Sequence, residues 1–130
     1  MLDLDNFKAV NDNYGHHVGY AALRKLSEVS HHALREIDII GRLGGEEFAV
    51  LLPETNTEKA LEVAERMRIA VESAAVKLEH GDSLHFTVSI GVSSFGEKDS
   101  GIDSMLKRAD AALYQAKNGG RNRVCVEGAA

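Results

Sequence analysis

The 130-residue chain contains one cysteine, one proline and no tryptophan. The lone cysteine, Cys125, excludes a disulfide within the chain and fits a reducing compartment, so we expect a cytoplasmic protein. No run of residues approaches the ~18 apolar residues of a membrane span, and no signal-peptide pattern is present, so we expect no membrane contact. The net charge of −5 argues against a nucleic-acid partner, but a small phosphate ligand needs only a few local cations or a metal.

The residues that are present suffice for one domain with one core, because 44% are apolar and 27% are charged. Hydrophobic periodicity and turn residues divide the chain into strands and helices. We expect strands at 1–5, 84–95 (broken at Gly91) and 123–126, a hairpin at 38–52, and helices at 7–14, at 17–35, from Thr55 or Asn56 onward, and at 102–117. The first strand begins at the first residue, which suggests a fragment whose upstream part is missing.

The order of these elements predicts the fold class. It contains a β-α-β-β-α-β arrangement, which forms an α+β fold with an antiparallel central sheet, helices mainly on one face, and a further helix and strand at the C-terminal end. In this ferredoxin-like topology the end of the first strand lies beside the hairpin. Asp3 and Asp5 would then lie close to Glu46 and Glu47, although the two aspartates taken alone fit better the polar face of a half-buried strand.

The tip of the hairpin, Gly44-Gly45-Glu46-Glu47-Phe48, is the most informative segment. Two adjacent carboxylates repel each other and contribute nothing to a turn. Glycines beside them leave room for a ligand, and hard oxygen ligands suit Mg²⁺ with its nucleotide phosphates. An ordinary hairpin with a solvated acidic tip is the alternative. Two acidic clusters that meet at one edge of the sheet favour a two-metal phosphoryl-transfer site.

Several segments together carry a resemblance to a known family. Residues 3–12 have the pattern DxDxFKxxND, residues 14–16 continue it, 42–48 contain Gly-Gly-Glu-Glu-Phe, and 88–92, 109–117 and 120–122 match a strand, a helix and a loop of the same family. In this order they resemble the GGDEF domain, the catalytic domain of bacterial diguanylate cyclases. The resemblance covers essentially the whole chain and lacks only the family's N-terminal helix and its DxLTxLxNR segment. We therefore expect one domain over 1–130, with the palm-like fold of nucleotidyl cyclases and without that helix.

The resemblance implies an activity, because the family condenses two GTP into cyclic di-GMP. By this resemblance Asp3, Glu46 and the backbone carbonyl of Leu4 would hold Mg²⁺, for which Mn²⁺ can substitute. Glu47 would assist at the metal or in activating the attacking 3′-hydroxyl. Each domain would bind one GTP, so a second GGDEF domain has to face the first, at least transiently.

A substrate-binding set also follows from the resemblance. Its members are Asn6, Phe7, Lys8, Asn11, Tyr20, Gly44, Gly45, Lys117 and Arg121. Backbone N–H groups around Phe7, at a helix start, would bind the terminal phosphates. Lys117 and Arg121 match the cations that bind the triphosphate, whereas their residue types alone indicate solvated surface cations. Asn11 matches a residue that recognises guanine, and its alternative is a local backbone cap.

At Tyr20 the sequence departs from the family, which has an aspartate after Gly19. That aspartate accepts hydrogen bonds from guanine, and a tyrosine hydroxyl cannot form the same paired contact. We expect the preference for guanine to weaken by on the order of 1.5–3 kcal/mol. The protein would then make cyclic di-GMP with poorer affinity, or accept adenine as well, or Tyr20 would pack elsewhere. The retained metal and phosphate positions favour the first of these.

Arg35 and Asp38 form an RxxD motif that ends a few residues before Gly44. At this offset the motif resembles the family's inhibitory site, where cyclic di-GMP binds and restrains turnover, and Arg66 matches a secondary arginine of that site. Arginine suits the purpose because its planar fork pairs with phosphates and guanine edges. The alternative is an ion pair at a helix end. Product could also bind at the active site itself if Tyr20 loosens the guanine pocket.

The leading functional hypothesis is therefore a diguanylate cyclase with product feedback. One alternative is a catalytically weak GGDEF domain that binds GTP or cyclic di-GMP as a regulatory module. Another is a cyclase with relaxed base choice. The retained Asp3, Glu46 and Glu47 favour an active cyclase, whereas Tyr20 and the missing N-terminal segment favour the regulatory module.

Overall fold

The computed structural model of the chain describes residues 1–127. Its helices are α1 (Phe7–Tyr14), α2 (His16–Ala33), α3 (Thr57–Ser73) and α4 (Ile102–Asn118). Its strands are β1 (Leu2–Leu4), β2 (Ile39–Gly44), β3 (Glu47–Leu51), β4 (Val76–Lys77), β5 (Ser83–Leu84), β6 (Val88–Val92) and β7 (Val124–Val126). The predicted helices, the hairpin and the first and last strands are present close to their expected ends.

Five strands form the central sheet in the order β2-β3-β1-β6-β7. β1 lies at the centre and is antiparallel to both of its neighbours, with Leu2 opposite Phe48 of β3 and Ile90 of β6. The first four strands thus have the predicted ferredoxin-like arrangement. β7 adds a parallel strand beside β6, because the chain crosses over through α4 before it returns to the sheet. Cys125 lies in this last strand.

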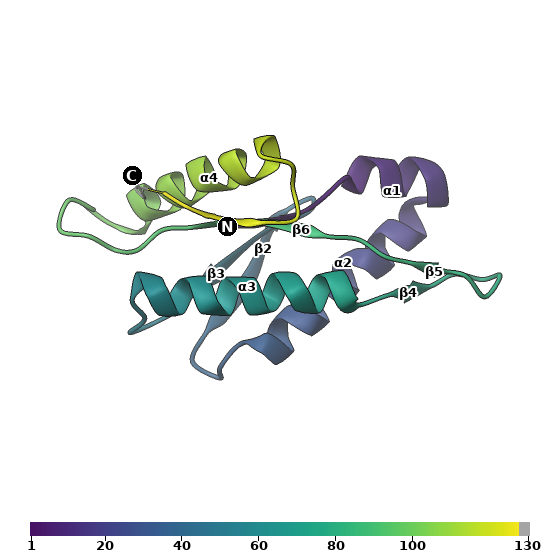
Figure 1. Ribbon diagram of the computed structural model, residues 1–130, viewed down its shortest axis with the longest axis horizontal. Coiled ribbons are helices and arrows are strands. Elements are labelled where there is room, and N and C mark those ends of the chain that lie inside the picture. Colours follow the sequence, from purple (N-terminus) through teal and green to yellow (C-terminus); the bar gives the residue numbers. More distant parts are fainter. Residues whose placement is uncertain (128–130) are drawn as a thin grey trace.

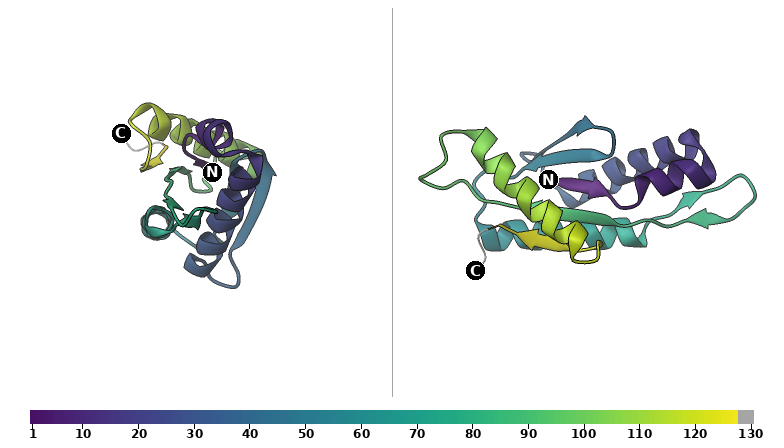
Figure 2. Two further views of the ribbon diagram at one scale, coloured as in Figure 1. Left: turned by 90° about the vertical axis from the view of Figure 1, so that its right-hand side faces the viewer. Right: turned by 90° about the horizontal axis from the view of Figure 1, so that it is seen from above.

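Two layers of helix enclose the sheet (Figure 1). α2 and α3 lie on one face, as predicted for the β-α-β-β-α-β part, and α4, the further helix expected at the C-terminal end, lies on the other, so that helices surround the sheet (Figure 2). The core between the sheet and the α2–α3 layer is apolar and includes Leu2, Leu4, Leu26, Phe48, Met67, Val71, Val88 and Ile90. Alternate residues of β6 face the two layers, so Val88 and Ile90 belong to this core while Ser89 and Gly91 lie towards α4.

The strand predicted at 84–95 is shorter in the structure, and the reasons are local. A turn at Gly81, which has a φ of +88°, pairs β4 with β5 in a separate small hairpin. Gly91 does not break the strand but lies inside β6. A Cβ atom added at Gly91 would lie 2.1 Å from the carbonyl oxygen of Ala109 and 2.2 Å from the backbone nitrogen of Leu113. Glycine is therefore needed where the backbone of α4 packs directly on the strand.

Among the four helices, α3 is the one whose N-terminus has a side-chain cap. The side chain of Asn56 accepts a hydrogen bond from the backbone N–H of Lys59 at 2.8 Å and caps α3. α2 ends at Ala33, before the predicted 35, because Leu34 already has an extended backbone. Among residues 1–127, no helix is both long and apolar enough to cross a membrane.

Candidate active site

A cleft of about 460 Å³ lies at the C-terminal end of β1. Four segments that are far apart in the sequence contribute to it: the end of β1, the start of α1, the hairpin tip, and the end of α4 with the turn that follows. Its lining residues are Asp3, Leu4, Asp5, Asn6, Phe7, Lys8, Ala9, Asp12, Glu46, Lys117 and Arg121. The cleft thus brings acidic, cationic and backbone N–H groups into one space.

Asp3 is one of two buried acids that line this cleft, with 5% of its surface exposed. The ammonium group of Lys117 donates a hydrogen bond to its Oδ2 atom, whereas its Oδ1 atom is buried and has no hydrogen-bond partner. Burial raises the pKa of Asp3 above its ordinary value, Lys117 opposes this rise, and the charges of Glu46 and Glu47 add to it. A buried carboxylate oxygen without a donor is costly to the free protein, and a bound cation would satisfy it.

Glu46 supplies the second carboxylate beside Asp3. The register of β1 and β3 pairs Asp3 with Glu47, and the N–H of Leu4 donates to the carbonyl oxygen of Glu46 at 3.3 Å. Glu47 itself lies outside the lining of the cleft. Within residues 1–127, no three side chains of His, Cys, Asp or Glu lie close enough together to hold a metal ion. Two carboxylates, a backbone carbonyl and phosphate oxygens are nevertheless a donor set that suits Mg²⁺.

Asp5 does not act as a third free acid. Its Oδ1 atom accepts a hydrogen bond from Ser89 at 2.6 Å, and its Oδ2 atom accepts from the hydroxyl of Thr87 at 2.7 Å and from the backbone N–H of Asn122 at 2.9 Å. Three donors therefore satisfy a carboxylate that is only 5% exposed. Of the four acids expected to cluster, Asp3, Asp5 and Glu46 line the cleft, Asp5 with both oxygens already hydrogen-bonded, and Glu47 lies beside Asp3 in the sheet.

Helix α1 begins at the cleft. Its N-cap residue, Asn6, has a left-handed backbone (φ 57°) and its side chain makes no capping hydrogen bond. The N–H groups of the first turn, around Phe7 and Lys8, therefore lack a side-chain acceptor, and together with the positive end of the helix dipole they favour an anion. Lys117, in the last turn of α4, and Arg121, just after it, line the same cleft.

The two residues expected to recognise the base lie outside the lining of this cleft. The Oδ1 atom of Asn11 is buried without a hydrogen-bond partner and fills the space beside Gly19, where an added Cβ would lie 1.9 Å from it. Tyr20 is 55% exposed and lines a separate groove of about 300 Å³ between α2 and β2, together with Arg24 and Arg42. The structure thus does not place Tyr20 with the acidic groups or with the groups that are predicted to bind phosphate.

Arg42 holds the tip of the hairpin. Its Nε atom donates a hydrogen bond to the carbonyl oxygen of Gly45 at 2.8 Å. Gly45 has a φ of +50°, which favours glycine. A Cβ added at Gly44 or Gly45 would meet no atom within 4 Å, so the space beside the adjacent glutamates is open. Neither glycine lines the cleft itself.

The RxxD motif lies apart from the cleft, after α2. The guanidinium of Arg35 pairs with Asp38 at 2.7 Å and also donates to the carbonyl of Pro53 at 3.0 Å and the hydroxyl of Thr55 at 2.8 Å. The hydrogen bond from Arg35 holds the pKa of Asp38 below its ordinary value, and the charge of Arg66 adds to this effect. Arg66 donates to the last carbonyl of α2 at 2.6 Å. The three residues of the predicted product site are therefore neighbours.

Comparison with known proteins decides the family. Residues 1–123 match the family model described as "Diguanylate cyclase, GGDEF domain". The chain belongs to the GGDEF family. Diguanylate cyclase A of Treponema denticola is 42% identical to this GGDEF domain over 126 residues, which are 97% of the chain and 34% of that protein. The GGDEF domain described here thus spans about a third of the length of that curated relative.

Solved structures of the family have the same fold. The active GGEEF domain of a diguanylate cyclase from Vibrio cholerae superimposes on this GGDEF domain with a TM-score of 0.90 and 36% identity, over 99% of this chain and 81% of that one. The GGDEF domain of DgcB from Caulobacter crescentus, in complex with c-di-GMP, gives a TM-score of 0.90 at 36% identity, over 96% of this chain and 74% of that one.

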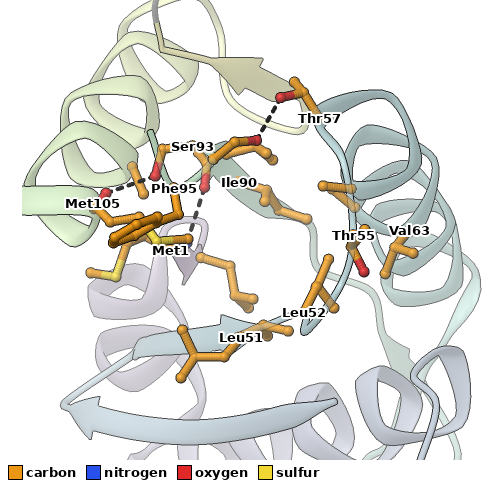
Figure 3. A pocket seen from close by; sticks show the side chains of 18 of the residues that line it. Met1, Leu51, Leu52, Thr55, Thr57, Val63, Ile90, Ser93, Phe95 and Met105 are labelled. Carbon is orange, nitrogen blue, oxygen red and sulfur yellow. Dashed lines mark hydrogen bonds between the residues drawn. The ribbon is translucent and has the colours of Figure 1, made fainter. Parts of the chain in front are cut away.

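A second cavity of the GGDEF domain is larger than the cleft and lies elsewhere. It measures about 630 Å³ and lies between β3, β6, α3 and the segment that leads into α4. Figure 3 shows mainly apolar side chains around it, including Leu51, Ile90, Phe95 and Met105. Among the described residues that line it, Glu54 has the only charged side chain. An apolar cavity of this kind has no cationic side chains to bind a triphosphate. A choice of candidate site by cavity volume alone would therefore have selected this cavity and not the polar cleft.

Sequence reasoning missed the groups that hold Asp5 in this GGDEF domain. They are the hydroxyls of Thr87 and Ser89 and the backbone of Asn122. One signal was available, because Ser89 lies between Val88 and Ile90 in a strand that is buried on both faces. A buried serine in such a strand needs a polar partner on its own face of the sheet.

Proposed function

We propose that the protein condenses two GTP into cyclic di-GMP, with each domain binding one GTP. The observation that carries this proposal is the cleft in which the orphaned Oδ1 atom of Asp3 lies with Glu46, Lys117 and Arg121. Acids for a divalent cation and cations for phosphates are the two groups that a nucleotidyl transfer needs in one place. Membership of the GGDEF family supports the same reaction.

Asp3, Glu46 and the backbone carbonyl of Leu4 would hold Mg²⁺, and the partnerless Oδ1 of Asp3 fits this role. When bound, the ion would polarise the α-phosphate and lower the pKa of the attacking 3′-hydroxyl. Lys117, which donates to Asp3 in the free protein, would turn to the phosphates of the nucleotide. Glu47, adjacent to Asp3 across the strands, would assist in activating the nucleophile.

The triphosphate would lie between the start of α1 and the end of α4. The free N–H groups around Phe7 and Lys8 would bind the terminal phosphates, and Arg121 would form charge-assisted hydrogen bonds to them. Gly44 and Gly45 would leave room for the nucleotide beside the glutamates. Because one cleft holds one nucleotide, two domains have to face each other for the 3′-hydroxyl of one GTP to reach the α-phosphate of the other.

The experiment that tests this function is a product assay. The purified protein at high concentration is incubated with GTP and Mg²⁺, and the products are identified by mass spectrometry. Cyclic di-GMP is the expected product. A folded protein that binds cyclic di-GMP but makes none would instead support the second candidate function, a regulatory nucleotide-binding module, which the loss of the family's aspartate at Tyr20 favours.

Replacing Tyr20 with aspartate tests base recognition. Tyr20→Asp restores the carboxylate that pairs with guanine in the family, so we expect the affinity for GTP to rise by roughly tenfold, corresponding to ~1.5 kcal/mol. The measurement is a calorimetric titration with GTP, and ATP serves as the matched ligand whose affinity should not rise. Unchanged GTP affinity would remove position 20 from the base pocket. The product assay with GTP plus ATP shows whether the wild-type protein makes mixed cyclic dinucleotides.

Product inhibition at the RxxD motif is tested by Arg35→Ala. We propose that cyclic di-GMP binds at Arg35, Asp38 and Arg66 and restrains turnover. The variant should keep its initial rate, because the motif lies outside the cleft, and should need at least about tenfold more cyclic di-GMP for half-inhibition, since it loses a paired arginine contact. Lys59→Ala, which removes an exposed cation from α3, is the matched control. An unchanged inhibition curve in Arg35→Ala would place product inhibition elsewhere, with the active site as the next candidate.

A further inference from the structure

The turn after α4 has a conformation that its residues do not favour. Gly120, Arg121 and Asn122 follow one another with φ values of 121°, 65° and 45°. For a residue other than glycine the left-handed region costs free energy, although asparagine adopts it more readily than most. Residues in such conformations persist when the surrounding structure holds them, and they gather at functional sites. Arg121, at the centre of this turn, lines the cleft.

Asn122 fastens the turn to other parts of the fold, while the backbone N–H of Arg121 donates to the carbonyl oxygen of Ala116 in α4 at 3.0 Å. The backbone N–H of Asn122 donates to the Oδ2 atom of Asp5 at 2.9 Å. Its side-chain carbonyl accepts from Arg68 at 2.9 Å, and its side-chain amide donates to Glu72 at 2.5 Å. The last two partners belong to α3, so the turn is fastened both to the end of β1 and to a helix on the other side of the sheet.

Asp5 is the buried acceptor for the backbone N–H of Asn122. Its carboxylate is satisfied by Ser89, Thr87 and Asn122, and it lies two residues after Asp3. It therefore ties the strand end that carries the acid of the cleft to the turn that carries a cation of the cleft. Asp3 has a carboxylate oxygen, Oδ1, without a hydrogen-bond partner, whereas both oxygens of Asp5 accept hydrogen bonds. We therefore assign Asp5 to holding the turn and not to binding a ligand.

We propose that Asp5 and Asn122 are positioning residues for phosphate binding, because they hold Arg121 in the left-handed conformation from which its side chain lines the cleft. The proposal rests on the proposed function, in which Arg121 contacts the triphosphate. Released from Asp5 and α3, the turn would keep its hydrogen bonds to the end of α4 but would lose those on its other side. Arg121 would then relax to backbone conformations that it prefers, and its guanidinium would leave the cleft. Both residues act through Arg121 and neither needs to touch the phosphates.

The test compares two substitutions at one position. Asn122→Gly loses the side-chain bonds but adopts positive φ freely and keeps its N–H for Asp5. Asn122→Ala loses the same bonds and disfavours positive φ. The probe is inorganic tripolyphosphate with Mg²⁺, which has no 3′-hydroxyl and cannot react, titrated calorimetrically into the full protein. Arg121→Ala and the double variant Asn122→Ala/Arg121→Ala complete a mutant cycle.

We expect Asn122→Ala to weaken tripolyphosphate binding by about tenfold, Asn122→Gly to stay within about threefold of the wild type, and the double variant to bind as Arg121→Ala does within about twofold. Equal binding by the wild type and Asn122→Ala, additive losses in the cycle, or a glycine variant as weak as the alanine variant would each overturn the proposal. If Asn122→Ala fails to fold, Arg68→Ala replaces it in the cycle with the same non-additive expectation. The product assay tests the proposed function separately. Absence of cyclic di-GMP from the wild-type protein would contradict the proposed function, whereas unchanged tripolyphosphate binding in Asn122→Ala would contradict the positioning role of the turn.

Discussion

The Glu46→Gln variant is expected to form cyclic di-GMP at least about a thousandfold more slowly than the wild type, a loss of about 4 kcal/mol of transition-state stabilisation. Glutamine preserves the size of the side chain and removes the negative charge that would hold the proposed divalent cation beside Asp3. Glu46 lines the cleft from a hairpin tip outside the apolar core, so the variant should fold normally. The measurement is the initial rate of product formation by mass spectrometry, with circular dichroism to verify folding.

Glu58→Gln is the matched control, because Glu58 is an exposed acid in the first turn of α3, outside the cleft. It should retain the wild-type rate. A Glu46→Gln variant with more than about a tenth of the wild-type rate would contradict the assigned role, since a missing ligand to the cation costs several kcal/mol.

The same variant gives a readout that does not depend on turnover. The charge of Glu46 contributes to the raised pKa of Asp3, so the pKa of Asp3 should be lower in Glu46→Gln. Because the folded-state pKa of this acid lies above its unfolded-state value, ionisation of Asp3 removes stability as the pH rises from the unfolded-state value through the folded-state one. Between these two pKa values, the free energy of unfolding should therefore fall less with rising pH in Glu46→Gln than in the wild type. Carboxyl NMR titration and urea unfolding at several pH values measure the two effects.

Gly91→Ala is expected to destabilise the fold by about 3 kcal/mol or more and to lower the melting temperature by roughly 10 °C. The added methyl group would overlap backbone atoms of Ala109 and Leu113. Backbone atoms within a helix cannot rotate away as a flexible side chain can, so α4 would have to lift from β6. Thermal unfolding followed by circular dichroism measures the effect.

Gly41→Ala is the matched substitution for this comparison. Gly41 also lies within a strand, β2, and a Cβ added there would meet no atom within 4 Å. Its stability should change by less than about 0.5 kcal/mol. Equal effects of the two substitutions would show that loss of glycine from the sheet, and not contact with α4, determines the stability.

Sequence patterns predicted most of the elements because local spacing determines them. The apolar spacing of α2, α3 and α4 marked those helices, and the two glycines after Leu43 placed the hairpin tip. The meeting of Asp3 with Glu46 followed from topology alone, since a central first strand has to pass the hairpin in a ferredoxin-like sheet. These features depend on contacts within one element or on the order of elements.

The features that were missed depend on contacts between elements. Gly91 was interpreted as a break in a strand because the sequence does not indicate that a helix backbone packs against it. Asp5 was grouped with the free acids because its donors, Thr87, Ser89 and Asn122, lie more than eighty residues away. The position of Tyr20, in a groove beside two arginines, also depends on contacts between elements, and its assignment to base recognition stays a prediction.

The direct packing of α4 on β6 has a consequence for ligand binding. With no side chain at Gly91 between the two backbones, the helix packs closely on the sheet, and Lys117 at the end of that helix reaches Asp3 in the free protein. The cation and the acid are thus preorganised at the cleft. If a nucleotide binds there as proposed, Lys117 has only to exchange Asp3 for the phosphates and does not have to be brought to the cleft, so less of the binding free energy is lost to conformational entropy.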